Sequence, residues 1–170
     1  MKQVTQHNNS GEIRVERVPA PTLKAGFVLV QTHFSLISPG TERSSISARK
    51  STLLEKAKRN PELIQKVLEQ FKQFGILNTY RRVRARLDAA SSLGYSAAGV
   101  VVAVGSGVPG LKPGDKVACG GGGYANHAEF ILVPKNLCVK VPDGVRLEDA
   151  AYTTLGAIAL QGVRQVDPAM

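Results

Sequence analysis

The stretch that decides the fold runs from Leu93 to Ala118 and reads LGYSAAGVVVAVGSGVPGLKPGDKVA. The valines at positions 100, 102 and 104 alternate with Val101 and Ala103, so both faces are apolar, as expected of a strand buried between two layers. Glycines at 105, 107 and 110 interrupt this strand. Pro113-Gly114-Asp115 is typical of a turn, because proline presets φ and glycine supplies a positive φ. The pattern of strand, glycine-rich loop, turn and strand predicts a small β-barrel.

Other extended segments lie on both sides of this stretch and make the predicted fold mainly β with some α. Residues 12–18 predict a half-buried strand with Ile13 and Val15 pointing inward. Residues 27–34 predict a longer strand, with Val28 and Val30 on one face. After a run of glycines, two more strands are expected at 127–133 and 138–141.

A helical insertion separates the early strands from the late ones. Between residues 43 and 92 the spacing of apolar residues changes from two to nearly four, which predicts short helices with one apolar face each. Helical spacing returns after residue 150. We therefore expect a β-barrel domain from 1–42 and 93–150, a basic helical insertion at 43–92, and a linking helix at 151–170.

The net charge of +9 belongs to that insertion. Twelve of the 22 Lys and Arg residues lie between Arg43 and Arg86, against three acidic residues, so the rest of the chain is neutral. A binding module that docks an acidic partner or a nucleic acid through this basic segment is one alternative, and a surface for homo-oligomerisation is another. Nucleic acid is disfavoured because aromatic residues, which stack on bases, make up only 5% of the chain.

The sequence also indicates the cellular compartment of the protein. No apolar run approaches the length of a membrane span, and the N-terminal residues do not resemble a secretory signal, so we expect a cytoplasmic protein without a membrane partner. Cys119 and Cys138 do not form a CxxC motif, which favours reduced, structural thiols.

The order of these segments resembles one enzyme family. The segments MKQVTQ, EIRVERVPAP, VLVQTHFSLIS, LGYSAAGVVVAVGSGV, LKPGDKVA, YANHAEFILVP and DAAYTTLGAIALQGV resemble the GroES-like N-terminal domain of medium-chain dehydrogenase/reductases. The Ser-Pro-Gly-Thr-Glu loop and the basic insertion are most similar to a bacterial bi-domain oxidoreductase subgroup. The resemblance implies hydride transfer between NAD or NADP and a small-molecule carbonyl, alcohol or activated alkene.

The resemblance also implies where a catalytic zinc would be bound in zinc-dependent relatives. The three ligand positions fall here on Ser38, on Tyr95 with Ser96, and on Thr154. Zinc is normally held by thiolate, imidazole or carboxylate groups, so we expect no metal at these positions.

In this family the cofactor lies mainly on a Rossmann domain, which is absent from this sequence. The spacing of Gly105, Gly107 and Gly110 matches GxGxxG, but it follows a barrel strand and leads to no helix, so a plain loop is the preferred interpretation. We expect a C-terminal Rossmann domain in the full-length protein. The fragment alone is expected to be inactive.

Candidate site residues follow from the same resemblance. We assign catalysis to Glu42, Tyr95 and Ser38, with Glu42 as an acid or base if burial raises its pKa. Thr41 and Glu42 are equally typical of the start of a helix. Tyr95 either donates to a carbonyl oxygen or fills an apolar site. Cofactor contacts are expected from Ser38, Gly40, Thr41 and Thr154, and the substrate pocket from Tyr124, Asn126 and His127.

Overall fold

A computed structural model describes residues 1–8, 10–40, 75 and 90–166 of the chain. Its strands are β1 (Lys2–His7), β2 (Ile13–Arg17), β3 (Phe27–Ser35), β4 (Ala90–Ser92), β5 (Ser96–Val104), β6 (Lys116–Gly120), β7 (Phe130–Pro134) and β8 (Cys138–Lys140). A short 3-10 helix, η1 (Lys135–Leu137), precedes β8, and two helices follow it, α5 (Leu147–Ala150) and α6 (Thr153–Val166). The strands dominate, so the expected mainly β fold is confirmed. The predicted helices of the insertion lie outside the described residues.

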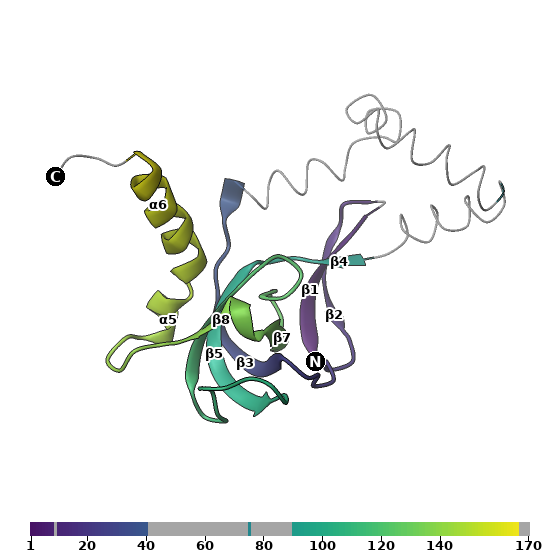
Figure 1. Ribbon diagram of the computed structural model, residues 1–170. Coiled ribbons are helices and arrows are strands. Elements are labelled where there is room, and N and C mark those ends of the chain that lie inside the picture. Colours follow the sequence, from purple (N-terminus) through teal and green to yellow (C-terminus); the bar gives the residue numbers. More distant parts are fainter. Residues whose placement is uncertain (9, 41–74, 76–89, 167–170) are drawn as a thin grey trace. The chain divides into compact units, whose positions relative to one another are not determined.

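Two sheets contain all the described strands. A five-stranded sheet has the order β7-β3-β5-β6-β8, and a three-stranded sheet has the order β2-β1-β4. The four pairings of the larger sheet are antiparallel, and the sheet curls into a half-barrel (Figure 1). By contacts, the described residues 1–4, 15–37 and 92–166 belong to one compact unit, and the described residues within 5–14 and 38–91 belong to another.

The core of the larger sheet is made mainly of valine and other small apolar residues, as the valine-rich sequence predicts. Its buried members are Val28, Val30, Ala97, Val101, Val117, Cys119, Ala125, Ile131 and Val133. No helix among the described residues is long and apolar enough to span a bilayer.

Glycine is required where β3 and β5 lie side by side. Gly99 faces Thr32 in the ladder, and a Cβ at Gly99 would overlap the backbone carbonyl oxygen of Gln31. The strands can keep this spacing only with a hydrogen atom at position 99.

The predicted turn between β5 and β6 is confirmed. Gly114 has a φ of 91°, and its N–H donates to the carbonyl of Val101. Asp115 is buried and accepts hydrogen bonds from Nζ of Lys140 and from the N–H of Lys112, each 2.9 Å long. The bond from the Lys140 ammonium, followed by that from the Lys112 N–H, holds the pKa of the Asp115 carboxyl below its ordinary value.

Three expectations about strands are wrong. β5 is buried on both faces only over its first residues, because Val102 is 43% exposed. Ile13 and Val15 do not point inward, since they are 46% and 68% exposed. The chain also returns to β structure at Ala90, inside the range predicted to be helical, because β4 pairs with β1 and this pairing overrides a weak local preference.

Candidate functional site

The start of β5 lies at the junction of three elements. The N–H of Leu36, just after β3, donates to the carbonyl of Ser96 over 2.9 Å. The hydroxyl of Ser96 donates in turn to the carbonyl of Ala151, in the turn between α5 and α6, over 2.6 Å. Ser96 is fully buried. A single residue therefore connects the end of β3 with the start of the C-terminal helix.

The neighbours of Ser96 bring two predicted site residues to the same place. The carbonyl of Tyr95 accepts a hydrogen bond of 2.9 Å from the N–H of Gly121. A Cβ on Gly120 would stand 2.9 Å from Oγ1 of Thr154, so the Thr154 hydroxyl lies directly against the backbone of β6. We call Tyr95, Ser96, Gly120, Gly121 and Thr154 the β5–α6 junction.

The side chains of the junction do not fit a zinc ion. Tyr95, Ser96 and Thr154 offer only hydroxyl groups, whereas zinc sites in proteins use thiolate, imidazole or carboxylate ligands. The described part of the chain contains no group of three His, Cys, Asp or Glu residues placed to hold a metal. What the junction does offer is hydrogen-bond donors and acceptors.

The other residues assigned to catalysis and cofactor binding lie outside the β5–α6 junction. Ser38 follows β3 and is half-buried, and Gly40 is exposed. Both belong to the second compact unit, so the structure does not define their position relative to the junction. Thr41 and Glu42 lie outside the described residues.

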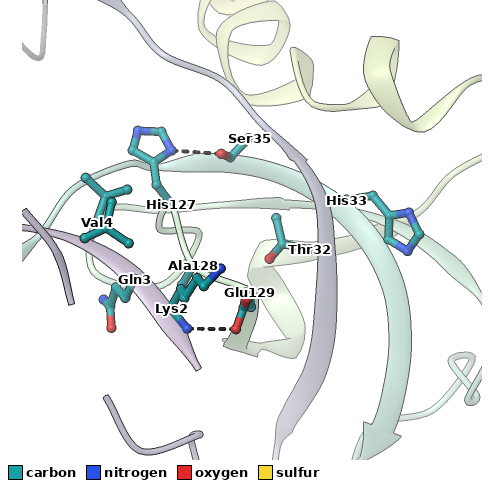
Figure 2. A pocket seen from close by; sticks show the side chains of 10 residues that line it. Lys2, Gln3, Val4, Thr32, His33, Ser35, His127, Ala128 and Glu129 are labelled. Carbon is teal, nitrogen blue, oxygen red and sulfur yellow. Dashed lines mark hydrogen bonds between the residues drawn. The ribbon is translucent and has the colours of Figure 1, made fainter. Parts of the chain in front are cut away.

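The three predicted pocket residues line two adjoining hollows, which share Gln3 and Ala128. Tyr124 and Asn126 line an open hollow of about 350 Å³ together with Phe130. His127 lines a different one, of about 310 Å³ (Figure 2). Their assignment to one substrate pocket stays a prediction.

Each of these residues has a defined setting. Nδ1 of His127 lies 2.9 Å from Oγ of Ser35. The ring of Tyr124 packs at a tilt against that of Phe27, with the centroids 6.4 Å apart. Asn126 is 8% exposed, and its Oδ1 has no hydrogen-bond partner within the described residues.

The hollow around His127 also contains polar residues that the sequence did not single out. Figure 2 shows Thr32, His33 and Ser35 of β3 around it, and the backbone N–H of Lys2 donating to Oε2 of Glu129 over 2.7 Å. These residues come from segments far apart in the chain, so no motif spacing connects them. Only the polar residues at the end of β3, after an apolar beginning, hinted at a hollow there.

The loop with GxGxxG spacing is not a nucleotide-binding turn. β5 ends at Val104 and the next element is β6, beginning at Lys116, with no helix between them. The preference for a plain loop at Gly105, Gly107 and Gly110 is confirmed, because a dinucleotide-binding turn must open a helix.

Comparison with known proteins agrees with this geometry. The alcohol dehydrogenase GroES-like domain matches residues 68–143. Probable D-xylulose reductase A of Neosartorya fischeri is 31% identical over 100 residues, covering 43% of this chain and 28% of the reductase. A quinone oxidoreductase of Pseudomonas aeruginosa is 38% identical over 71 residues, covering 42% of this chain and 22% of that protein.

Solved structures show the same fold along nearly the whole chain. The quinone oxidoreductase from Coxiella burnetii superimposes with a TM-score of 0.65 at 21% identity, covering 98% of this chain and 45% of its own. A mycobacterial protein complexed with NADPH gives a TM-score of 0.66 at 21% identity, covering 99% of this chain and 42% of its own.

Fold, domain match and relatives together define a GroES-like domain of the alcohol dehydrogenase type. This match, over residues 68–143, agrees with the sequence resemblance to the medium-chain dehydrogenase/reductases. It spans 28% and 22% of the two curated relatives described above.

Proposed function

We propose that this chain is the catalytic-side domain of an NAD(P)-dependent oxidoreductase that transfers hydride to or from a carbonyl, an alcohol or an activated alkene. The β5–α6 junction carries the proposal. The backbone of Tyr95 is hydrogen-bonded to Gly121, and the Thr154 side chain at the start of α6 lies against Gly120. The family resemblance assigns both residues to positions of the catalytic site.

A bound nicotinamide would supply or accept the hydride, and the residues of this chain would position the reactants and move a proton. The Tyr95 phenol is suited to donate a hydrogen bond to the oxygen of a carbonyl substrate. The Thr154 hydroxyl is suited to bind a ribose hydroxyl or an amide. Because Ser96 connects β5 to the turn before α6, it would keep these two groups in register.

We propose that the reaction proceeds without zinc. The hydroxyl groups of Ser38, Tyr95 and Thr154 occupy the family's ligand positions, and none of them is a usual zinc ligand. A side chain that donates a proton to the substrate oxygen would then take the place of a zinc ion acting as the Lewis acid. Glu42 stays a proposed acid or base, and Ser38 a proposed relay, on the family resemblance alone.

The nucleotide would be bound mainly by a further domain. A dinucleotide gains much of its affinity where a glycine turn opens a helix, and the described GxGxxG loop opens none. In α6, Ile158, Leu160 and Val163 are all at least half exposed, which favours a covering surface. The matched part of this chain covers only 28% and 22% of the two curated relatives.

Calorimetric titration with NADH and NADPH tests whether a further domain is needed to bind the cofactor. Residues 1–170 alone should show no measurable binding, and the full-length gene product should bind one of the two cofactors. Micromolar binding by residues 1–170 alone would refute the half-site arrangement.

Kinetics of the full-length protein test the residue roles. Tyr95→Phe should lower kcat more than it raises KM for the cofactor, because the lost hydroxyl acts on the reacting oxygen. Tyr152→Phe, on an exposed turn residue, is the matched control and should leave both constants unchanged. Glu42→Gln should also lower kcat, and an unchanged rate would reduce Glu42 to a helix cap.

A further inference from the structure

Two thiols that the proposed reaction does not use face each other across neighbouring strands. Cys119 in β6 lies directly opposite Cys138, the first residue of β8, and their Sγ atoms are 3.8 Å apart. We propose that this pair is a reversible oxidation site, at which a small-molecule disulfide of the glutathione type converts the two thiols into a Cys119–Cys138 disulfide. The inference does not depend on the proposed function.

The register of the ladder favours this bond. The N–H of Val141 donates to the carbonyl of Lys116, which marks that pair as hydrogen-bonded. Hydrogen-bonded and non-hydrogen-bonded pairs alternate along an antiparallel ladder, so the Cys119–Cys138 pair, three steps further on, is a non-hydrogen-bonded pair. Such pairs have Cα atoms about 4.5 Å apart, which lies within the disulfide range that begins at about 4.4 Å.

The position of β8 gives the bond room to form. β8 is the edge strand of the five-stranded sheet and pairs with β6 alone within it. An edge strand can shift slightly toward its one neighbour without breaking a second ladder. The two sulfur atoms therefore need only side-chain rotation and a small adjustment of β8 to reach bonding distance.

The two cysteines differ in a way that assigns their roles. Cys138 is half-buried and accepts a hydrogen bond from the thiol of Cys119, which is 3% exposed. That hydrogen bond lowers the pKa of the Cys138 thiol and, with burial, raises that of Cys119. Cys138 is thus the accessible nucleophile, and Cys119 the protected partner.

The reaction proceeds by two thiol–disulfide exchanges. The Cys138 thiolate attacks one sulfur of oxidised glutathione, forming a mixed disulfide and releasing one glutathione thiolate. The Cys119 thiol then loses its proton to that thiolate or to water and attacks Sγ of Cys138, which releases the second glutathione. Overall, two protein thiols are oxidised and one glutathione disulfide is reduced to two thiols.

The bond would enclose the segment that borders the β5–α6 junction. Residues 120–137 lie between the two cysteines and include Gly120 and Gly121, together with some of the residues that line the two hollows. A cross-link at the base of this segment restricts the unfolded chain and stabilises the folded one.

The experiment treats the reduced, folded protein with oxidised glutathione and measures its intact mass after an acid quench. We expect a loss of two hydrogen atoms, no retained glutathione, a cross-linked peptide joining Cys119 to Cys138, and full reversal by dithiothreitol. The oxidised protein should unfold at a higher urea concentration than the reduced one. Two unchanged thiols, a lasting mixed disulfide, or a disulfide-linked dimer would each overturn the proposal.

Single variants test the roles of the two thiols. In Cys119→Ser, glutathione should stay attached to residue 138, because the second thiol is missing. In Cys138→Ser, Cys119 should stay unmodified under the same treatment, because it is buried. Equal modification of both variants, with circular dichroism showing that each is folded, would contradict the assignment of Cys138 as the nucleophile.

Discussion

Removing one hydroxyl group at the β5–α6 junction should measurably destabilise the protein. Ser96 is fully buried, and its hydroxyl donates a hydrogen bond of 2.6 Å to the carbonyl of Ala151, which is also buried. Ser96→Ala deletes the donor and leaves a buried carbonyl without it, at a cost of about 1–3 kcal/mol. For a chain of this size, each kcal/mol lowers Tm by about 2–4 °C, so we expect a decrease of about 2–12 °C.

Thermal unfolding followed by circular dichroism measures this shift. Ser106→Ala removes the same atom from an exposed turn residue and should change stability by no more than about 0.5 kcal/mol. If Ser96→Ala and Ser106→Ala have the same Tm, the hydrogen bond does not connect β5 to the C-terminal helix. The proposed role of Ser96 in positioning Tyr95 and Thr154 would then lose its basis.

Three further predictions concern the sheet, the turn and the absence of zinc. Gly99→Ala should destabilise the protein by about 1–3 kcal/mol, because its methyl group would overlap the carbonyl of Gln31. Gly122→Ala is the control, because a methyl group there enters open space and should leave stability nearly unchanged. Equal midpoints of urea unfolding for the two variants would contradict this prediction. The lowered pKa of Asp115 means that its contribution to stability is present above the unfolded pKa of about 4 and is lost as the pH falls through the lower folded pKa. Asp115→Asn should therefore flatten the dependence of Tm on pH in acid, and identical slopes for the two proteins would exclude this linkage. Elemental analysis should find no stoichiometric zinc, and one zinc per chain that resists mild chelation would show that our assignment of the ligand positions is wrong.

The sequence was most informative where structure depends on neighbouring residues. The turn at Pro113-Gly114-Asp115 was predictable because it depends on proline and glycine within a few positions. β4 was not predicted, because Ala90 and its neighbours form a strand only by pairing with β1, more than eighty residues earlier. The burial of Ile13 and Val15 was wrongly predicted because alternation shows that a strand has two faces but not which partner covers them.

For the candidate site, too, the sequence could predict some features and not others. Tyr95 and Thr154 stay predictions from the family resemblance; the structure places Tyr95 beside Gly121 and Thr154 beside Gly120. The hydrogen bond from Ser96 to Ala151, which joins residues 55 positions apart, has no signal in either local sequence. The facing of Cys119 and Cys138 likewise depends on the register of β6 against β8, which their spacing in the sequence does not reveal.

The most direct test of the central claim is hydride transfer by the full-length protein, measured as oxidation of NADPH or NADH in the presence of a quinone, a ketone or an aldehyde. We expect turnover with at least one of these acceptors, transfer of a single hydrogen of a stereospecifically deuterated cofactor to the product, and a lower kcat in Tyr95→Phe. A full-length protein that binds the cofactor yet transfers no deuterium to any carbonyl or alkene, or one whose transfer rate is unchanged by Tyr95→Phe, would contradict the account.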